Sequence, residues 1–280
     1  MLKQRRASLS EIRLFFAKRL AAASRPDDAR FEHVFASVRR EDFLSPGPWR
    51  IGMGGIWLQT PTADPVYVYQ NGLIALDETK SINNGEPFLH AAWLGAVCPK
   101  AGDQICHIGV GLGYYTAILL ELATPSGHVT GIELDERLAA GARKNLANYA
   151  NVEVISGDAT KLSLPISNLI YVNAGVAAPP ASWLKSLRPQ GSIIFPWRPS
   201  EAVGLTLLVP RQDQGFEVKP LMPSWFIPCV GAADTGECVK GPNMEEARAV
   251  RIIWPSSDRS PDETAIAIFK DVWFSTAVLD

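Results

Sequence analysis

Long apolar runs, paired cysteines and an excess of charge are all missing from this sequence of 280 residues. No hydrophobic stretch approaches the ~18 residues that span a bilayer, so we expect a soluble protein with no membrane partner. The four cysteines show no C-x-x-C spacing, which argues against a zinc site and a redox pair and fits free thiols in the cytoplasm. A formal net charge of −2 and an isoelectric point near 6.1 argue against a nucleic-acid partner.

The composition is typical of a globular protein with a buried core, because 47% of the residues are hydrophobic and 20% are charged. The first 25 residues contain seven Lys or Arg and one acid, Glu11, which could indicate a basic targeting helix. However, Ser8 and Glu11 have the spacing of a helix capping box, and Ile12, Phe16 and Leu20 fall on one helical face. This pattern favours an amphipathic helix that docks on the protein.

From residue 104 onward, short apolar stretches alternate with helical patterns. Strands are predicted at 105–108, 128–133, 152–155, 169–173 and 192–195, and helices at 115–123, 136–149 and 181–187. This alternation predicts an α/β protein with a Rossmann-like, doubly wound and mostly parallel sheet. An N-terminal helical segment precedes the sheet. Strand patterns at 203–209, 249–254 and 265–274 predict antiparallel strands that complete the sheet and continue into a β-rich C-terminal extension.

A glycine-rich loop runs from His107 to Gly113, with Gly109, Gly111 and Gly113 placed after a predicted strand and before a predicted helix. Glycine lets the backbone turn tightly and approach a ligand, and the helix N-terminus offers N–H groups to an anionic group. Glu133 ends the next strand, 20 residues beyond Gly113, where a carboxylate can accept both hydroxyls of a ribose. The loop and the acid together predict a cofactor that contains adenosine. The simpler alternative is a tight strand–helix turn that binds no ligand.

The spacing of the glycines distinguishes between two such cofactors. A dinucleotide site of the form G-x-G-x-x-G would place its third glycine at Tyr114, where a bulky ring stands. The observed G-x-G-x-G suits a ligand without a pyrophosphate, so we predict S-adenosyl-L-methionine. Asp158 follows the third strand, where it can accept the adenine amino group, and Asn173 ends the fourth strand near the transferable methyl group.

These features predict an S-adenosylmethionine-dependent methyltransferase without a metal ion. The predicted cofactor-binding residues are His107, Gly109, Val110, Gly111, Gly113, Tyr114, Glu133, Leu134, Asp158, Ala159 and Asn173. Proline and glycine are concentrated at 44–65, which predicts a loop with at most one short strand, and strands are predicted at 66–69 and 73–76. We expect three parts: N-terminal helices and a substrate-approach segment at 1–80, the methyltransferase core at 81–210, and the β-rich extension at 211–280.

The sequence resembles the protein-L-isoaspartate O-methyltransferase family of Rossmann-like methyltransferases, mainly between residues 31 and 196. Phe35-Ala-Ser-Val-Arg-Arg-Glu-Asp-Phe43 is similar to the family motif AF-x-x-VPRE-x-F, and Ile108–Tyr114 is similar to the IGTGSGY loop. Leu187–Pro196 is similar to the family's LKPGG segment, and Phe226–Pro228 to its FVP strand. The resemblance implies the same fold and cofactor.

The sequence departs from this family where the acceptor is expected to bind. The family's I-S-x-P turn, whose hydroxyl residue lies at the substrate, is replaced by Ile82-Asn-Asn-Gly-Glu-Pro87. We therefore expect a changed acceptor that is contacted by Asn83, Asn84 and Glu86, although Asn-Asn-Gly is also a good turn sequence in its own right. His107 stands where family members have an acid.

The acceptor is expected to be a carboxylate or hydroxyl group of a small molecule or a protein. A carboxylate is already ionised at neutral pH and needs no general base, whereas a phenol or alcohol would need one. A short-chain dehydrogenase is suggested by Tyr171-Val-Asn-Ala-Gly175, but it would need a later Tyr-x-x-x-Lys pair, and Tyr171 is the last tyrosine. A non-catalytic S-adenosylmethionine-binding module with the same fold stays open as an alternative, and the oligomeric state stays open too.

Overall fold

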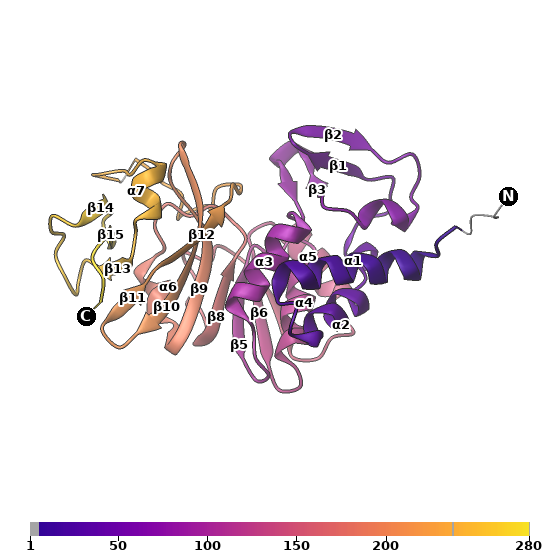
Figure 1. The fold of residues 1–280 in the computed structure, drawn as a ribbon, viewed down its shortest axis with the longest axis horizontal. Coiled ribbons are helices and arrows are strands. Elements are labelled where there is room, and N and C mark those ends of the chain that lie inside the picture. The colour runs from indigo at the N-terminus through magenta and orange to yellow at the C-terminus, as the bar shows by residue number, and fades with distance from the viewer. Residues whose placement is uncertain (1–5, 237, 280) are drawn as a thin grey trace.

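The computed structural model describes residues 6–236 and 238–279, which form one large sheet with helices against it and a small second sheet above one end (Figure 1). Within these residues the α-helices are α1 (Leu9–Ser24), α2 (Ala29–Ser37), α3 (Pro87–Val97), α4 (Tyr114–Ala123), α5 (Glu136–Asn145), α6 (Ala181–Lys185) and α7 (Met244–Arg248). No helix in these two ranges is both long enough and apolar enough to cross a bilayer.

The N-terminal helix α1 follows directly from its sequence pattern. The predicted capping box is present, because the Glu11 N–H donates to Oγ of Ser8 at 3.3 Å and the Ser8 N–H donates to Oε2 of Glu11 at 2.8 Å. Phe16 and Leu20 are buried, and the helix packs on α2 and α3. The basic N-terminal stretch is therefore a docked helix from Leu9 onward.

The large sheet confirms the predicted Rossmann-like order in its parallel half. Its parallel strands are β5 (Gln104–Ile108), β6 (His128–Glu133), β7 (Val152–Ser156), β8 (Ser167–Val172) and β9 (Leu187–Ser200). They lie in the order β7-β6-β5-β8-β9, so the direction of winding reverses between β5 and β8. In sheets of this kind, ligands bind at the carboxyl ends of the strands beside that reversal.

Both faces of the central parallel strands β5, β6 and β8 are buried, which explains their nearly continuous apolar sequences. Ile105 and Leu169 belong to a core cluster with helices α1 to α4, whereas their neighbours Cys106 and Ile170 belong to a second cluster on the opposite face. Alternate residues of a strand point to opposite faces, so β5, β6, β8 and β9 each contribute to both clusters.

The β-rich C-terminal extension continues the same sheet in antiparallel fashion. Its strands are β10 (Val203–Gln212), β11 (Gly215–Glu217), β12 (Lys219–Pro223), β13 (Ile252–Pro255), β14 (Ala265–Ile268) and β15 (Val272–Ser275). From β9 the order is β10-β11-β13-β15-β14, with β12 paired to β10. Phe274 of β15 stacks on Trp197 of β9, with ring centroids 4.4 Å apart, so extension and parallel half share a core.

The segment between α2 and α3 differs from the sequence-based expectation. It forms a small antiparallel sheet in the order β2-β1-β3-β4, made of β1 (Arg50–Met53), β2 (Ile56–Gln59), β3 (Leu73–Asp77) and β4 (Ile82–Asn83). The region expected to hold at most one strand therefore holds the β1–β2 hairpin, which turns through Gly54 and Gly55. Three short 3₁₀ helices lie at Arg40–Phe43, Pro65–Val68 and Glu78–Lys80.

The predicted strand at 66–69 is wrong, because residues Pro65–Val68 form one of these 3₁₀ helices. Asp64 caps it by accepting a hydrogen bond from the Val66 N–H at 3.0 Å, and Pro65 occupies the first turn. Proline at that position is pre-organised for a helical turn, and this local signal outweighs the β-branched composition.

Candidate active site

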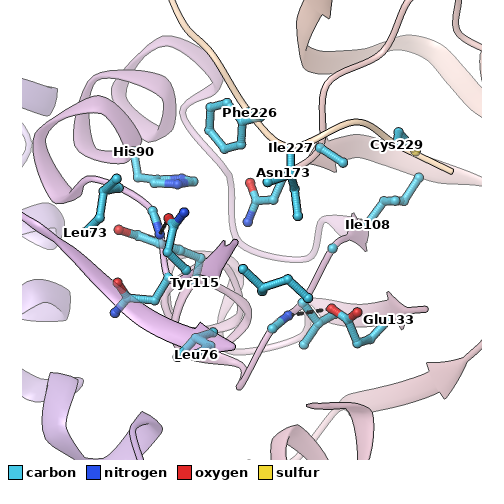
Figure 2. Close-up of a pocket in the computed structure, with 18 of the residues that line it drawn as sticks. Leu73, Leu76, His90, Ile108, Tyr115, Glu133, Asn173, Phe226, Ile227 and Cys229 are labelled. Atoms are coloured by element: carbon cyan, nitrogen blue, oxygen red, sulfur yellow. Dashed lines mark hydrogen bonds between the residues drawn. The ribbon is translucent and has the colours of Figure 1, made fainter. Parts of the chain in front are cut away.

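One cavity of about 850 Å³ lies at the carboxyl ends of β5, β6 and β8, at the predicted edge of the sheet (Figure 2). Its floor is the glycine loop and the ends of these strands. One wall comes from the small sheet and the start of α3, and the opposite wall is the extended segment Pro223–Val230. The cavity thus lies between parts of the chain that are far apart in sequence.

The glycine loop curves over the end of β5. Gly109, Gly111 and Gly113 all have positive φ angles, of 80°, 59° and 97°. Gly109, Val110, Gly111 and Tyr114 line the cavity, whereas Gly113 lies outside its wall. A Cβ on Gly113 would lie 3.0 Å from Leu146, so this glycine lets the loop pack against the segment after α5.

Glu133 at the end of β6 is held by the backbone around it. Its Oε2 accepts the Gly111 N–H at 2.7 Å, and its Oε1 accepts the Asp135 N–H at 3.0 Å. Burial raises the pKa of this carboxyl group, and the backbone N–H bonds partly offset that effect. Each oxygen keeps a lone pair for a ribose hydroxyl, so Glu133 can fix the loop and hold the sugar together.

The predicted adenine end lies next to Glu133. Leu134 is half exposed at the cavity mouth, and Ala159 is buried in the wall. Asp158 accepts hydrogen bonds from the N–H and the hydroxyl of Thr160, at 2.9 and 2.7 Å. The hydrogen bond from the Thr160 hydroxyl is the main cause that lowers the pKa of Asp158. The carboxylate is therefore an ionised hydrogen-bond acceptor at neutral pH.

His107 lies below the cavity floor and does not line the cavity. It is fully buried, its Nδ1 lies 2.8 Å from the Thr116 hydroxyl, and its Nε2 lies 2.8 Å from Nδ2 of Asn173. Burial lowers its pKa to about 3, so the ring is neutral. Asn173 itself lines the cavity, and its Oδ1 is buried with no partner among residues 6–236 and 238–279. His107 therefore acts on the site through the amide of Asn173.

The predicted acceptor residues Asn83, Asn84 and Glu86 all line the other end of the cavity. Oδ1 of Asn84 accepts the Ile74 N–H at 3.0 Å and a guanidinium N–H of Arg40 at 3.2 Å. This leaves Nδ2 of Asn84 as a buried donor without a partner in the described chain.

Tyr115 also lines this end, and its buried hydroxyl likewise lacks a hydrogen-bond partner in the part of the chain that the structure covers. Glu86 is anchored at its Oε1 by the side-chain amide of Asn71, at 2.6 Å. Asn84 and Tyr115 therefore provide two unpaired hydrogen-bond donors at one end of the cavity.

Several lining residues could not be identified individually from the sequence. Segment Pro223–Val230, Tyr115, Leu73, Leu76 and the hairpin residues Gly52–Gly54 all contribute to the wall. Among these residues, the sequence singles out Phe226–Pro228, through its similarity to a family motif. The remaining positions reach the cavity by tertiary packing.

Two ion pairs connect the small sheet to the cofactor end. Lys80 pairs with Asp135, and Arg137 pairs with Asp77 at 2.7 Å. Lys80 and Asp135 both line the cavity, so the small sheet is tied across the ribose end of the site. No cluster of three or more His, Cys, Asp or Glu side chains suited to a metal ion occurs within the described residues.

The residues present fit S-adenosylmethionine. The loop and the start of α4 can receive the amino-acid part, Glu133 the ribose and Asp158 the adenine amino group. The unpaired Oδ1 of Asn173 is a buried acceptor that needs a donor, and the ammonium group of the ligand is one.

This site allows a pH prediction, because burial is the main cause that lowers the pKa of both His90 and His107 and keeps the two rings neutral. The affinity for S-adenosylhomocysteine, measured by calorimetry, should therefore stay constant between about pH 6 and pH 8. A titration step in that range that is absent from the His107→Gln variant would contradict the prediction.

Comparison with known proteins agrees with this geometry. A family model described as Protein-L-isoaspartate(D-aspartate) O-methyltransferase (PCMT) matches residues 59–234. A protein-L-isoaspartate O-methyltransferase from Ignicoccus hospitalis is 31% identical over 148 residues, which cover 51% of this chain and 70% of the relative. The corresponding enzyme from Pelotomaculum thermopropionicum is 32% identical over 170 residues, which cover 59% and 72%.

Solved structures show the same fold. One protein-L-isoaspartate O-methyltransferase superposes with a TM-score of 0.66 at 17% identity, covering 93% of this chain and 86% of its own. A Plasmodium falciparum protein, described as a candidate of the same kind in complex with S-adenosyl-L-homocysteine, superposes with a TM-score of 0.61 at 16% identity, covering 78% and 97%.

The Rossmann-like sheet, the glycine loop with its acid and these comparisons define an S-adenosylmethionine-dependent methyltransferase. Within that class, the chain belongs to the protein-L-isoaspartate(D-aspartate) O-methyltransferase family, whose model matches well over half of its length.

Proposed function

We propose that this enzyme transfers the methyl group of S-adenosylmethionine to a carboxylate oxygen of an acceptor bound between β4 and α4. The observation that supports this most directly is the pair of buried, unpaired donors, Nδ2 of Asn84 and Oη of Tyr115. A buried donor without a partner is costly, and an ionised carboxylate accepts hydrogen bonds without donating any.

The chemistry needs binding and orientation more than proton transfer. The bound sulfonium supplies the methyl group, and an ionised carboxylate attacks it without losing a proton. A positive and a negative charge disappear together in this reaction, so apolar surroundings favour it. Leu73, Phe226 and Ile227 provide such surroundings in the cavity wall.

We further propose that the acceptor has changed from the isoaspartyl group named in the relatives. The turn Ile82–Pro87 carries no hydroxyl residue, and it presents the amides of Asn83 and Asn84 in its place. The side-chain amide of Asn71 donates to Glu86 and accepts the Phe88 N–H. The acceptor end therefore has a different set of polar groups.

A labelled-methyl assay tests both statements. An isoaspartyl peptide, its aspartyl counterpart and a small-acid extract are each incubated with labelled S-adenosylmethionine. Methyl esters hydrolyse in mild base, so a base-labile product from the extract is expected, with little from either peptide. Base-stable product would identify a hydroxyl or amine acceptor and contradict the carboxylate reaction. Efficient labelling of the isoaspartyl peptide alone would contradict the changed acceptor. Cofactor binding without any transfer would identify a non-catalytic module.

A further inference from the structure

A buried histidine, His90 of α3, lies at the acceptor end and has no part in the reaction described so far. It is 1% exposed, and its ring stacks on Tyr115 with centroids 3.7 Å apart and planes inclined by 21°. Figure 2 shows the ring extending from α3 toward the cavity, near Phe226, with which it makes an edge contact at 5.9 Å. The aromatic neighbours fix the plane of the ring.

Tyr171 of β8 determines which ring nitrogen carries the proton. Its hydroxyl is fully buried and lies 2.9 Å from Nδ1 of His90, its one hydrogen-bond partner among the described side chains and backbone. A buried hydroxyl needs an acceptor, so Tyr171 donates to Nδ1. Burial lowers the pKa of His90 well below its usual value, so the ring is neutral and its single proton is on Nε2.

Nε2 of His90 is directed to the wall of the cavity beside Gly85. A Cβ on Gly85 would lie 2.3 Å from this nitrogen, so only glycine lets the turn approach the ring. Gly85 also has a φ of +71°, a conformation that glycine adopts without strain. Both residues line the cavity, and Nε2 has no hydrogen bond to another described residue. An N–H donor therefore belongs to the lining of the same cavity as the donors of Asn84 and Tyr115.

The buried cation Arg40 contacts one of these neutral donor residues, Asn84. Arg40 is fully buried and donates to Oδ1 of Asn84, which polarises the amide and strengthens Nδ2 as a donor. The positive charge of Arg40 can therefore act on the acceptor through Asn84, without direct contact between the guanidinium group and the acceptor. Neutral donors orient a carboxylate and leave a lone pair free for attack.

Building on the proposed carboxylate reaction, we propose that His90 is a specificity-determining residue whose Nε2–H donates a hydrogen bond to the acceptor carboxylate, which stays ionised. Tyr171 holds the required tautomer, and Asn84 and Tyr115 complete a three-donor site. Three donors leave one of the roughly four acceptor positions of a carboxylate for the methyl group. Glu86, anchored on Asn71, is then placed to accept an N–H or O–H from the rest of the acceptor.

Two amide substitutions of His90 distinguish the role of Nδ1 from the role of Nε2. His90→Asn keeps a polar group near the position of Nδ1 for Tyr171 but has none at Nε2, whereas His90→Gln can place an N–H near Nε2. The KM for the carboxylic acid acceptor should rise about 10-fold or more in His90→Asn and be largely restored in His90→Gln, because the lost hydrogen bond is to a charged group. The dissociation constant for S-adenosylhomocysteine should be unchanged in both.

Trp93→Phe is the matched control. Trp93 belongs to the same aromatic cluster, with its ring 5.6 Å from His90, but its Nε1 donates to Thr206 and it does not line the cavity. This variant should keep the wild-type acceptor KM. A ring ¹⁵N spectrum of the wild type should show Nε2 protonated at neutral pH.

The outcomes separate the two proposals. Wild-type ester formation with equal KM values in His90→Asn and wild type would refute the role of His90 alone. An equal loss in His90→Asn and Trp93→Phe, or a proton on Nδ1, would also refute it. Absence of any base-labile product from the wild type would refute the carboxylate reaction and, with it, the role of His90.

Discussion

Replacing Gly111 with valine should lower the affinity for S-adenosylmethionine by about 100-fold or more. Gly111 has a φ of +59°, which is strained for a β-branched residue, and a Cβ there would lie 3.2 Å from Cδ1 of Leu76. Its N–H also donates to Glu133, so any shift of the loop moves the carboxylate that is to hold the ribose. The substitution therefore disturbs the loop and the acid together.

Calorimetry with S-adenosylmethionine and S-adenosylhomocysteine measures this effect. Gly55→Val is the matched control, because Gly55 also has a positive φ, of 82°, but has no atom within 4 Å of its Cβ position and does not line the cavity. The control should carry similar backbone strain and bind both ligands normally. Unchanged affinity in Gly111→Val would show that the cofactor does not lie on this loop.

Replacing Arg40 with leucine should lower the free energy of unfolding by about 3 kcal/mol or more. The guanidinium group is fully buried and donates to the carbonyls of Val68, Gln70 and Gly72 at 2.7 to 3.1 Å, and to Asn84. It has no ion-pair partner among the described acids, and burial lowers its pKa. Leucine removes the desolvation cost of the charge but deprives four acceptor groups of a hydrogen bond from a charged donor, and the second effect is larger.

Denaturant unfolding followed by tryptophan fluorescence measures the loss in Arg40→Leu. The neighbouring residue supplies the control, since Arg39 is about half exposed and pairs with Asp42 at the surface. Arg39→Leu should change stability by no more than about 1 kcal/mol. Equal stability of the two variants would contradict a structural role for the buried arginine.

The cofactor end of the site was predictable because it is built from consecutive residues. A strand, a glycine loop and a helix follow one another from residue 104 to residue 123, and Glu133 ends the very next strand. Each feature leaves a local signal, such as alternating glycines or an apolar run of strand length. The right-handed crossovers between parallel strands then place the loops that follow the strands at one edge of the sheet.

The acceptor end was less predictable because it is assembled from distant segments. His90, Tyr171 and Tyr115 come from α3, β8 and α4, and nothing in their local sequence indicates that they meet. The glycines and prolines around the β1–β2 hairpin obscure its two four-residue strands, so the sequence predicts a loop there with at most one short strand. His107 was expected at the cofactor because of its sequence neighbours, yet strand alternation turns its side chain toward Thr116.

The order of strands in the C-terminal extension has a consequence for how the protein folds. β15 follows β14 in the sequence, but it pairs between β13 and β14. The facing edges of β13 and β14 therefore stay unpaired until Val272–Ser275 takes its place between them. An exposed strand edge is a template for pairing with another chain. A folding intermediate that lacks β15 is thus expected to be open to pairing with other chains at this point of the sheet.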